Sequence, residues 1–142
     1  FFQNVEASWG ESRLAEALSA FRANFRATTE ALVRSYFRPD TDSTLIERIV
    51  SHMAGAPPEI AIPSFESIRR YDSRISLGGL TCPMAIINSD FWPTDAGALR
   101  RCHPAIRISV LPNSDHFLML GRPQAFNSAL EETISDWTAG WP

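Results

Sequence analysis

The chain has 142 residues, of which 44% are hydrophobic and 11% aromatic, enough for the core of one modest domain or of a piece of a larger one. The net charge is −3 without a block of like charge, so nothing indicates a nucleic-acid surface. All 13 basic residues are arginines. The sequence contains no run of about 18 apolar residues, the length that a membrane span requires.

The cysteines and the first residues bear on the cellular setting. Cys82 and Cys102 are too few and too sparsely placed for a disulfide framework or a zinc site. We therefore expect no metal or other cofactor, and a reduced, cytoplasmic setting. The segment Phe1–Val5 has no basic region followed by an apolar stretch, so no signal peptide is expected. It also lacks an initiator methionine, which suggests a truncated or processed chain.

Residues 1–75 have the hydrophobic periodicity of helices. We expect Ser12 to cap the first helix. After it, apolar residues recur at three- and four-residue steps: Leu14, Ala17, Leu18, Phe21 and Phe25. Residues 4–9, which precede it, have only a weak strand pattern. Thr28 or Thr29 is expected to cap a second helical piece. The first part of the chain is therefore predicted to be helical.

Two further helices are expected in the same part. The segment 40–43 (Asp-Thr-Asp-Ser) offers N-caps for a helix that Gly55 and the two prolines after it close. Pro63 is expected near the start of another helix, which carries Phe65.

Residues 76–142 change to an alternating pattern of strands and helices. The segment 80–87 is almost continuously apolar, which is typical of a parallel strand covered on both faces. A helix is expected over 94–102, and a second strand over 106–110, where apolar and polar residues alternate. Pro123 suits the first turn of a last helix, whose apolar face would be Phe126, Leu130, Ile134 and Trp137. This order predicts an α/β fold with a right-handed parallel unit, whose two strands make an incomplete sheet.

One acid and one histidine follow these strands directly. Asp90 comes after the first predicted strand, and His116 after the second. Reactive groups of an open parallel sheet gather at the carboxyl ends of its strands, and neighbouring strands lie only about 5 Å apart. The Asp90 carboxylate could then orient the imidazole of His116, whose other nitrogen would take a proton from a nucleophile. The spacing therefore predicts an acid and a general base.

The residues around this pair closely resemble the α/β-hydrolase family. The likeness is carried by Leu80–Asp90 (LTCPMAIINSD), by Val110–Leu120 (VLPNSDHFLML) and by the Arg-Pro at 122–123 that opens the last helix. It covers residues 76–138 well, and implies that they are the last strand-helix-strand-helix of a hydrolase core, with Asp90 and His116 as catalytic acid and base. Residues 1–75 resemble the family's helical cap more loosely. Asp115 departs from the pattern, because the family has a small residue before the histidine.

Other titratable residues compete with this pair. Asp95 lies at an expected helix start, where a carboxylate favours the helix dipole, so we interpret it as structural. Asp115 is interpreted as a turn residue that cannot easily bond the ring of its neighbour. His52 is expected to be a helix residue, and His103 a loop residue before a proline.

The nucleophile of the family is missing from the sequence. The family elbow is G-x-S-x-G between a strand and a helix, and the nearest string, Gly10–Leu14 (GESRL), lacks the second glycine. Cys82 would lie at the wrong end of its strand, and Cys102 in a helix without a nearby base. We therefore expect a serine, or in its place an aspartate or a cysteine, outside this chain, and no turnover by the chain alone.

The resemblance implies a carboxylic-ester hydrolase acting on a small ester-like substrate, with the N-terminal half of the hydrolase core as partner. Five side chains could line its pocket, although helical spacing favours core positions for such residues: Tyr36, Phe37, Met53, Phe65 and Trp92. One alternative is a non-catalytic fragment that completes a sheet with an N-terminal partner by strand addition. Another is a hydrolase-fold protein that uses the histidine for cofactor-free chemistry or ligand sensing. The sequence indicates no binding to nucleic acid or membranes.

Overall fold

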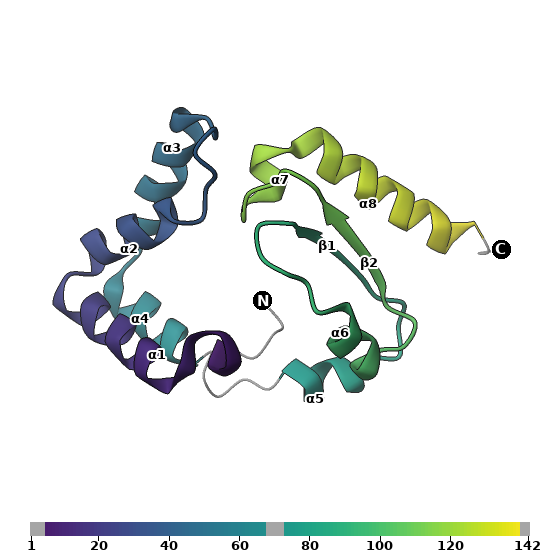
Figure 1. The fold of residues 1–142 in the computed structure, drawn as a ribbon, viewed down its shortest axis with the longest axis horizontal. Coiled ribbons are helices and arrows are strands. Elements are labelled where there is room, and N and C mark those ends of the chain that lie inside the picture. Colours follow the sequence, from purple (N-terminus) through teal and green to yellow (C-terminus); the bar gives the residue numbers. More distant parts are fainter. Residues whose placement is uncertain (1–4, 68–72, 140–142) are drawn as a thin grey trace. The chain divides into compact units, whose positions relative to one another are not determined.

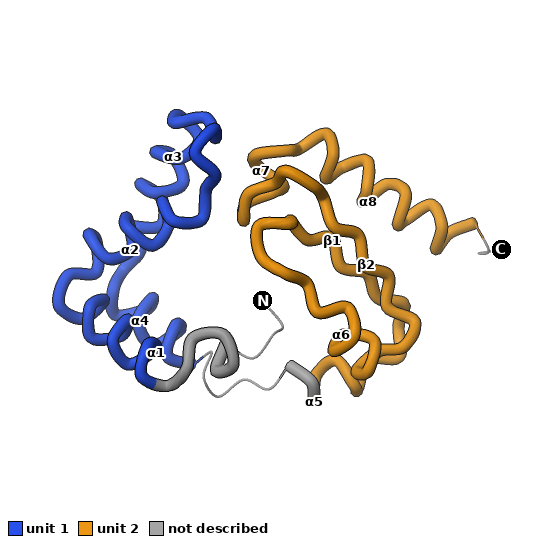
Figure 2. Tube along the Cα trace, viewed as in Figure 1, with its two compact units in different colours: residues 1–73 blue, residues 74–142 orange. Residues whose placement is uncertain are grey.

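A computed structural model describes residues 5–67 and 73–139 of the chain. It divides into two compact units, Phe1–Ser73 and Arg74–Pro142 (Figure 2). The first is helical, and the second follows the order β-α-β-α, so the predicted α/β class is confirmed at this level. The interpretation of the two units as a hydrolase cap and part of a hydrolase core stays a prediction.

Unit 1 consists of helices that follow one another along the chain (Figure 1): α1 (Val5–Ala23), α2 (Phe25–Arg34), α3 (Ser43–Ala54) and α4 (Pro58–Ser67). The expected cap at Ser12 is wrong, because Ser12 lies within α1. Residues 5–9, in the expected weak strand, are helical too. Gly10 does not break the helix, since one glycine in a helix costs only about 1 kcal/mol relative to alanine.

The side chain that caps α2 is Asn24, so the expectation of Thr28 or Thr29 is wrong. Asn24 Oδ1 accepts a hydrogen bond from the backbone N–H of Ala27 at 3.1 Å. An asparagine directly before the first turn can reach these free N–H groups, whereas the two threonines lie inside the helix. The expected caps before α3 are confirmed, as Asp42 Oδ1 accepts from Thr44 N at 2.9 Å.

The fourth helix begins earlier than expected. Pro58 occupies the first turn of α4, where the missing N–H of a proline does no harm, and Pro63 lies inside the helix. Rings and aliphatic side chains from neighbouring helices form the core of unit 1, and Phe21 meets Phe65 with ring centroids 5.1 Å apart. The buried hydrophobic residues are Leu14, Leu18, Phe21, Val33, Phe37, Ile49, Val50 and Ala54.

Unit 2 contains β1 (Ala85–Ser89) and β2 (Arg107–Leu111), which pair in parallel with Ala85 opposite Arg107 and Ser89 opposite Leu111. Helix α6 (Ala96–Cys102) connects them. The first strand starts five residues later than the expected position 80, because Pro83 has no N–H to donate to a ladder. Three further helices belong to this part of the chain: α5 (Ser73–Gly78), α7 (Leu118–Gly121) and α8 (Pro123–Thr138).

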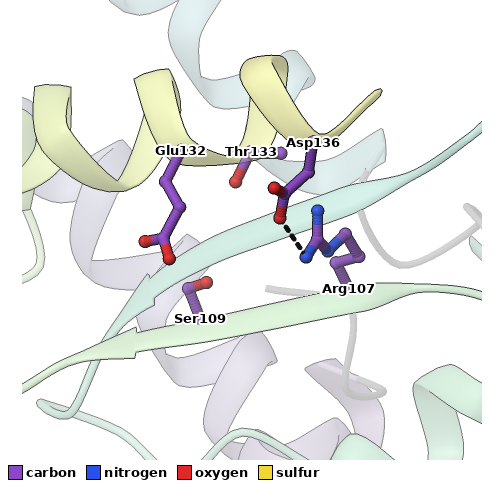
Figure 3. A pocket seen from close by; sticks show the side chains of 5 residues that line it. All are labelled: Arg107, Ser109, Glu132, Thr133 and Asp136. Carbon is purple, nitrogen blue, oxygen red and sulfur yellow. Dashed lines mark ion pairs between the residues drawn. The ribbon is translucent and has the colours of Figure 1, made fainter. Parts of the chain in front are cut away.

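The two faces of this small sheet are covered differently. Ile86 and Ile108 point to the side of α6, where they pack on a buried cluster of Leu77, Leu99 and Ile106. Side chains alternate along a strand, so Arg107 and Ser109 point to the opposite face. There they line a polar pocket of about 90 Å³ together with Glu132, Thr133 and Asp136 of α8, and Arg107 forms an ion pair with Asp136 (Figure 3).

The apolar face expected for the last helix is not buried in the described part of the chain. The exposed fractions are 39% for Leu130, 48% for Ile134 and 39% for Trp137. Val110 on β2 is 45% exposed as well. The polar residues Glu132, Thr133 and Asp136 of α8 line the pocket with β2, and apolar side chains stay exposed on both β2 and α8. Phe126, the first residue of the expected apolar face, is half-buried.

Within residues 5–67 and 73–139, no helix has the length and hydropathy that crossing a bilayer requires.

Thr29 offers a test of the packing in unit 1. Its side chain is 95% buried, and Oγ1 has no hydrogen-bond partner among the described residues. Thr29→Val replaces the hydroxyl by a methyl group, so we expect the free energy of unfolding to rise by about 1 kcal/mol. Chemical denaturation measures this. The matched control is Thr28→Val, which removes the bond from Thr28 Oγ1 to the Ala20 carbonyl and should give no gain. A loss of stability in Thr29→Val would show that its hydroxyl is satisfied.

Candidate functional site

Asp90 joins the carboxyl ends of the two strands. It directly follows β1, and its backbone N–H donates to the Leu111 carbonyl, at the end of β2, at 3.2 Å. Its carboxylate accepts two backbone hydrogen bonds, from Asn113 N to Oδ2 at 2.9 Å and from Ser114 N to Oδ1 at 3.1 Å. Bonds from N–H groups to a carboxylate are stronger than those between neutral groups. One side chain therefore holds the turn that follows the other strand.

The turn after β2 has a conformation that suits this arrangement. Asn113 has φ of 53°, in the left-handed region that asparagine tolerates better than most residues. This bend directs two successive N–H groups toward Asp90, as in backbone anion sites. Arg122 Nη1 donates to the Asn113 carbonyl at 3.1 Å and so supports the turn from the start of α8. Ser114 is almost fully buried, and Asp115 is buried beside it.

The loop after β1 is also fixed by side chains. Asn88 donates from Nδ2 to Thr94 Oγ1 at 2.7 Å, which ties the end of β1 to the approach to α6. Asp95 caps α6, accepting from Ala98 N at 2.8 Å. The expected structural role of Asp95 thus has a physical basis, and the loop that carries Asp90 is anchored at both ends.

His116 lies among aromatic rings at the same end of the sheet. Its ring centroid is 5.0 Å from that of Trp92 and 5.0 Å from that of Phe117, and Phe91 meets Trp92 at 4.9 Å. Burial lowers the pKa of His116 below its ordinary value of 6.5. The imidazole is therefore mainly neutral at neutral pH, the form that can accept a proton.

The remaining expected positions lie in other elements of the chain. His103 ends α6, before β2, and its Nε2 lies 3.2 Å from the Cys82 carbonyl. His52 is exposed on α3, in unit 1, as expected of a helix residue. Cys82 is exposed ahead of β1, while Cys102 lies in α6 and packs on the buried cluster of unit 2. Among the described residues, no group of three or more His, Cys, Asp or Glu side chains could hold a metal ion.

The sequence did not predict the contacts that three side chains make in this region. Arg122 was noted only as part of the family motif, and its hydrogen bond to the Asn113 carbonyl was not expected. Trp92 was named as a possible pocket residue; it is 44% exposed, and its ring is tilted by 60° to the imidazole of His116. Asn88 gave no signal beyond its place at the end of a strand. Contacts between segments that are distant in the sequence leave no local periodicity to detect.

Comparison with known proteins gives no family. No protein-family model matches the chain, and no curated protein is significantly similar to it. The likeness to α/β-hydrolases therefore rests on the motifs around Asp90 and His116.

The contribution of Asp90 to the turn can be measured by amide hydrogen exchange. Asp90→Ala removes both acceptors, so we expect exchange at Asn113 and Ser114 to accelerate roughly tenfold or more. Asp95→Ala is the matched control, because it frees the N–H of Ala98 on α6 and should leave the turn protected. Unchanged exchange at Asn113 and Ser114 in Asp90→Ala would contradict the proposed hold on the turn.

The protonation of His116 sets a second test. We expect its pKa, followed by NMR titration, to lie below 6.5, since burial disfavours the imidazolium. Between that lowered pKa and 6.5 the unfolded chain binds more protons than the folded chain, so stability falls as pH decreases through this window. His116→Gln should lose this component of the pH dependence and identify the signal. A measured pKa at or above 6.5 would show that the ring is not held in an apolar environment.

Proposed function

We propose that this chain is the C-terminal portion of an α/β-hydrolase, a carboxylic-ester hydrolase in which Asp90 and His116 are the acid and base of a nucleophile-histidine-acid triad. The observation that carries the proposal is the pair of hydrogen bonds from Asn113 and Ser114 to the Asp90 carboxylate. They bring the acid after one strand against the turn that leads to the histidine after the next. This proximity supports the proposal, in which the carboxylate orients the imidazole of His116.

In the proposed reaction His116 takes the proton of a nucleophile supplied from outside this chain. The nucleophile then attacks the ester carbonyl, and His116 returns the proton to the leaving alcohol. Water resolves the acyl-enzyme through the same base. The half-buried, neutral imidazole of His116 supports this role, because an imidazolium could not accept the first proton. Asp90 stabilises the charge that His116 acquires.

The partner in this proposal is the N-terminal half of the hydrolase core. The uncovered apolar residues of unit 2 support it: Val110 on β2, and Leu130, Ile134 and Trp137 on α8. A sheet of two parallel strands is also smaller than independent stability normally needs. The same exposed residues also favour a second candidate, a non-catalytic fragment that joins a sheet without any chemistry. Activity separates the two.

The decisive material is the intact product of the source gene. We expect about 100 or more residues with a G-x-S-x-G elbow ahead of Phe1. We also expect hydrolysis of p-nitrophenyl acetate by the intact protein to fall by roughly 10⁴-fold or more in His116→Ala. Asp95→Ala is the matched control and should keep most of the activity, since this carboxylate caps α6.

Two outcomes would contradict the proposal. A source product without an elbow ahead of Phe1, or an intact protein whose esterase activity survives His116→Ala, would favour the non-catalytic candidate. Activity of the 142-residue chain alone, lost in His116→Ala, would show instead that the nucleophile lies within this chain.

A further inference from the structure

Trp92 stands out among the residues around His116. Its indole lies 5.0 Å from the imidazole, centroid to centroid, with an angle of 60° between the two planes. The rings of Phe91 and Trp92 form a T-shaped pair, with 4.9 Å between their centroids. The loop that carries both residues is tied across its base by the bond between Asn88 and Thr94. The indole is therefore held against one side of the imidazole by its own loop.

The physics of this contact differs between the two protonation states of the histidine. An aromatic ring carries negative charge on its face and attracts a cation within about 6 Å of its centroid, and indole does so most strongly. A neutral imidazole gains only packing from the same contact. The indole thus favours the imidazolium, whereas burial disfavours it.

We propose that Trp92 is a positioning residue that acts through His116: it fixes the imidazole ring in place and stabilises the positive charge that the ring acquires on taking a proton. This inference rests on the proposed function in one respect, because only a general base needs that charge stabilised. Trp92 compensates part of the penalty that burial places on the imidazolium. A base in an apolar site can then accept a proton without the site being opened to water.

Three charged groups lie near the turn that carries the ring. Two are carboxylates, which favour the imidazolium, and one is a guanidinium, which disfavours it. The Asp90 carboxylate is bound to the turn before His116, and Asp115 is buried immediately next to His116 in the sequence. The Arg122 guanidinium donates a hydrogen bond to the Asn113 carbonyl of the same turn. Substitutions at position 92 leave all three in place, so differences among such variants report the aromatic ring.

The test compares Trp92→Phe with Trp92→Leu in the 142-residue chain. Phenylalanine keeps a ring of weaker quadrupole, and leucine fills a similar space without one. The pKa of His116, read from its Cε1–H signal by NMR, should fall in the order tryptophan, phenylalanine, leucine. We expect about half a pKa unit between the first and the last. Trp137→Leu on α8 is the matched control and should leave the pKa of His116 unchanged.

The outcome that overturns the proposal is a pKa of His116 in Trp92→Leu equal to or higher than that in Trp92→Phe. The indole would then act only as a cover. If the leucine variant does not fold, Trp92→Tyr replaces it, and a pKa in either aromatic variant above that of the wild-type chain contradicts the proposal. The titration needs no catalytic activity, so it is independent of the esterase assay. In an active intact protein, the acidic limb of kcat/KM against pH should shift with the NMR value.

Discussion

The two hydrogen bonds from Asn113 and Ser114 to the Asp90 carboxylate are the constraint on which the rest of the site depends. They join the loops after β1 and β2 at the level where the strands end. The left-handed Asn113 makes both N–H groups available to one side chain, and Arg122 holds the carbonyl behind them. His116 follows this turn within three residues. Its position relative to the loop after β1 is therefore set by the backbone and does not depend only on contacts of the imidazole.

Burial of His116 has opposite effects on the two protonation states that the proposed base must adopt. Burial keeps the imidazole neutral and ready to accept a proton, but it also penalises the charge that follows. In the proposed mechanism, the carboxylate of Asp90 and the indole of Trp92 would both favour that charge, one by its negative charge and the other by its quadrupole. Apolar surface on β2 and α8 stays uncovered within the described residues, which accords with a site whose remaining parts come from another segment.

The strongest sequence signals came from local periodicity. Alternation over 106–110 located β2 within one residue of its observed bounds, and Pro123 marked the start of α8 correctly. The predicted N-caps of the first two helices were wrong. Ser12 lies inside α1, and Asn24 caps α2 in place of the threonines. For the candidate site, the sequence predicted only that Asp90 and His116 follow the two strands. The turn that links them, the bond from Arg122 to Asn113 and the ring contact of Trp92 are contacts between different elements, which no local pattern encodes.

Covalent trapping of the intact source protein would test the proposal that His116 serves a nucleophile from outside this chain. A fluorophosphonate would phosphonylate the activated serine, and a crystal structure of the adduct would show what surrounds it. We expect a modified serine ahead of Phe1 in the sequence, with an imidazole nitrogen of His116 within hydrogen-bond distance of the serine oxygen and the other nitrogen facing Asp90. A modified serine that is distant from His116, or an intact protein that does not react, would contradict it.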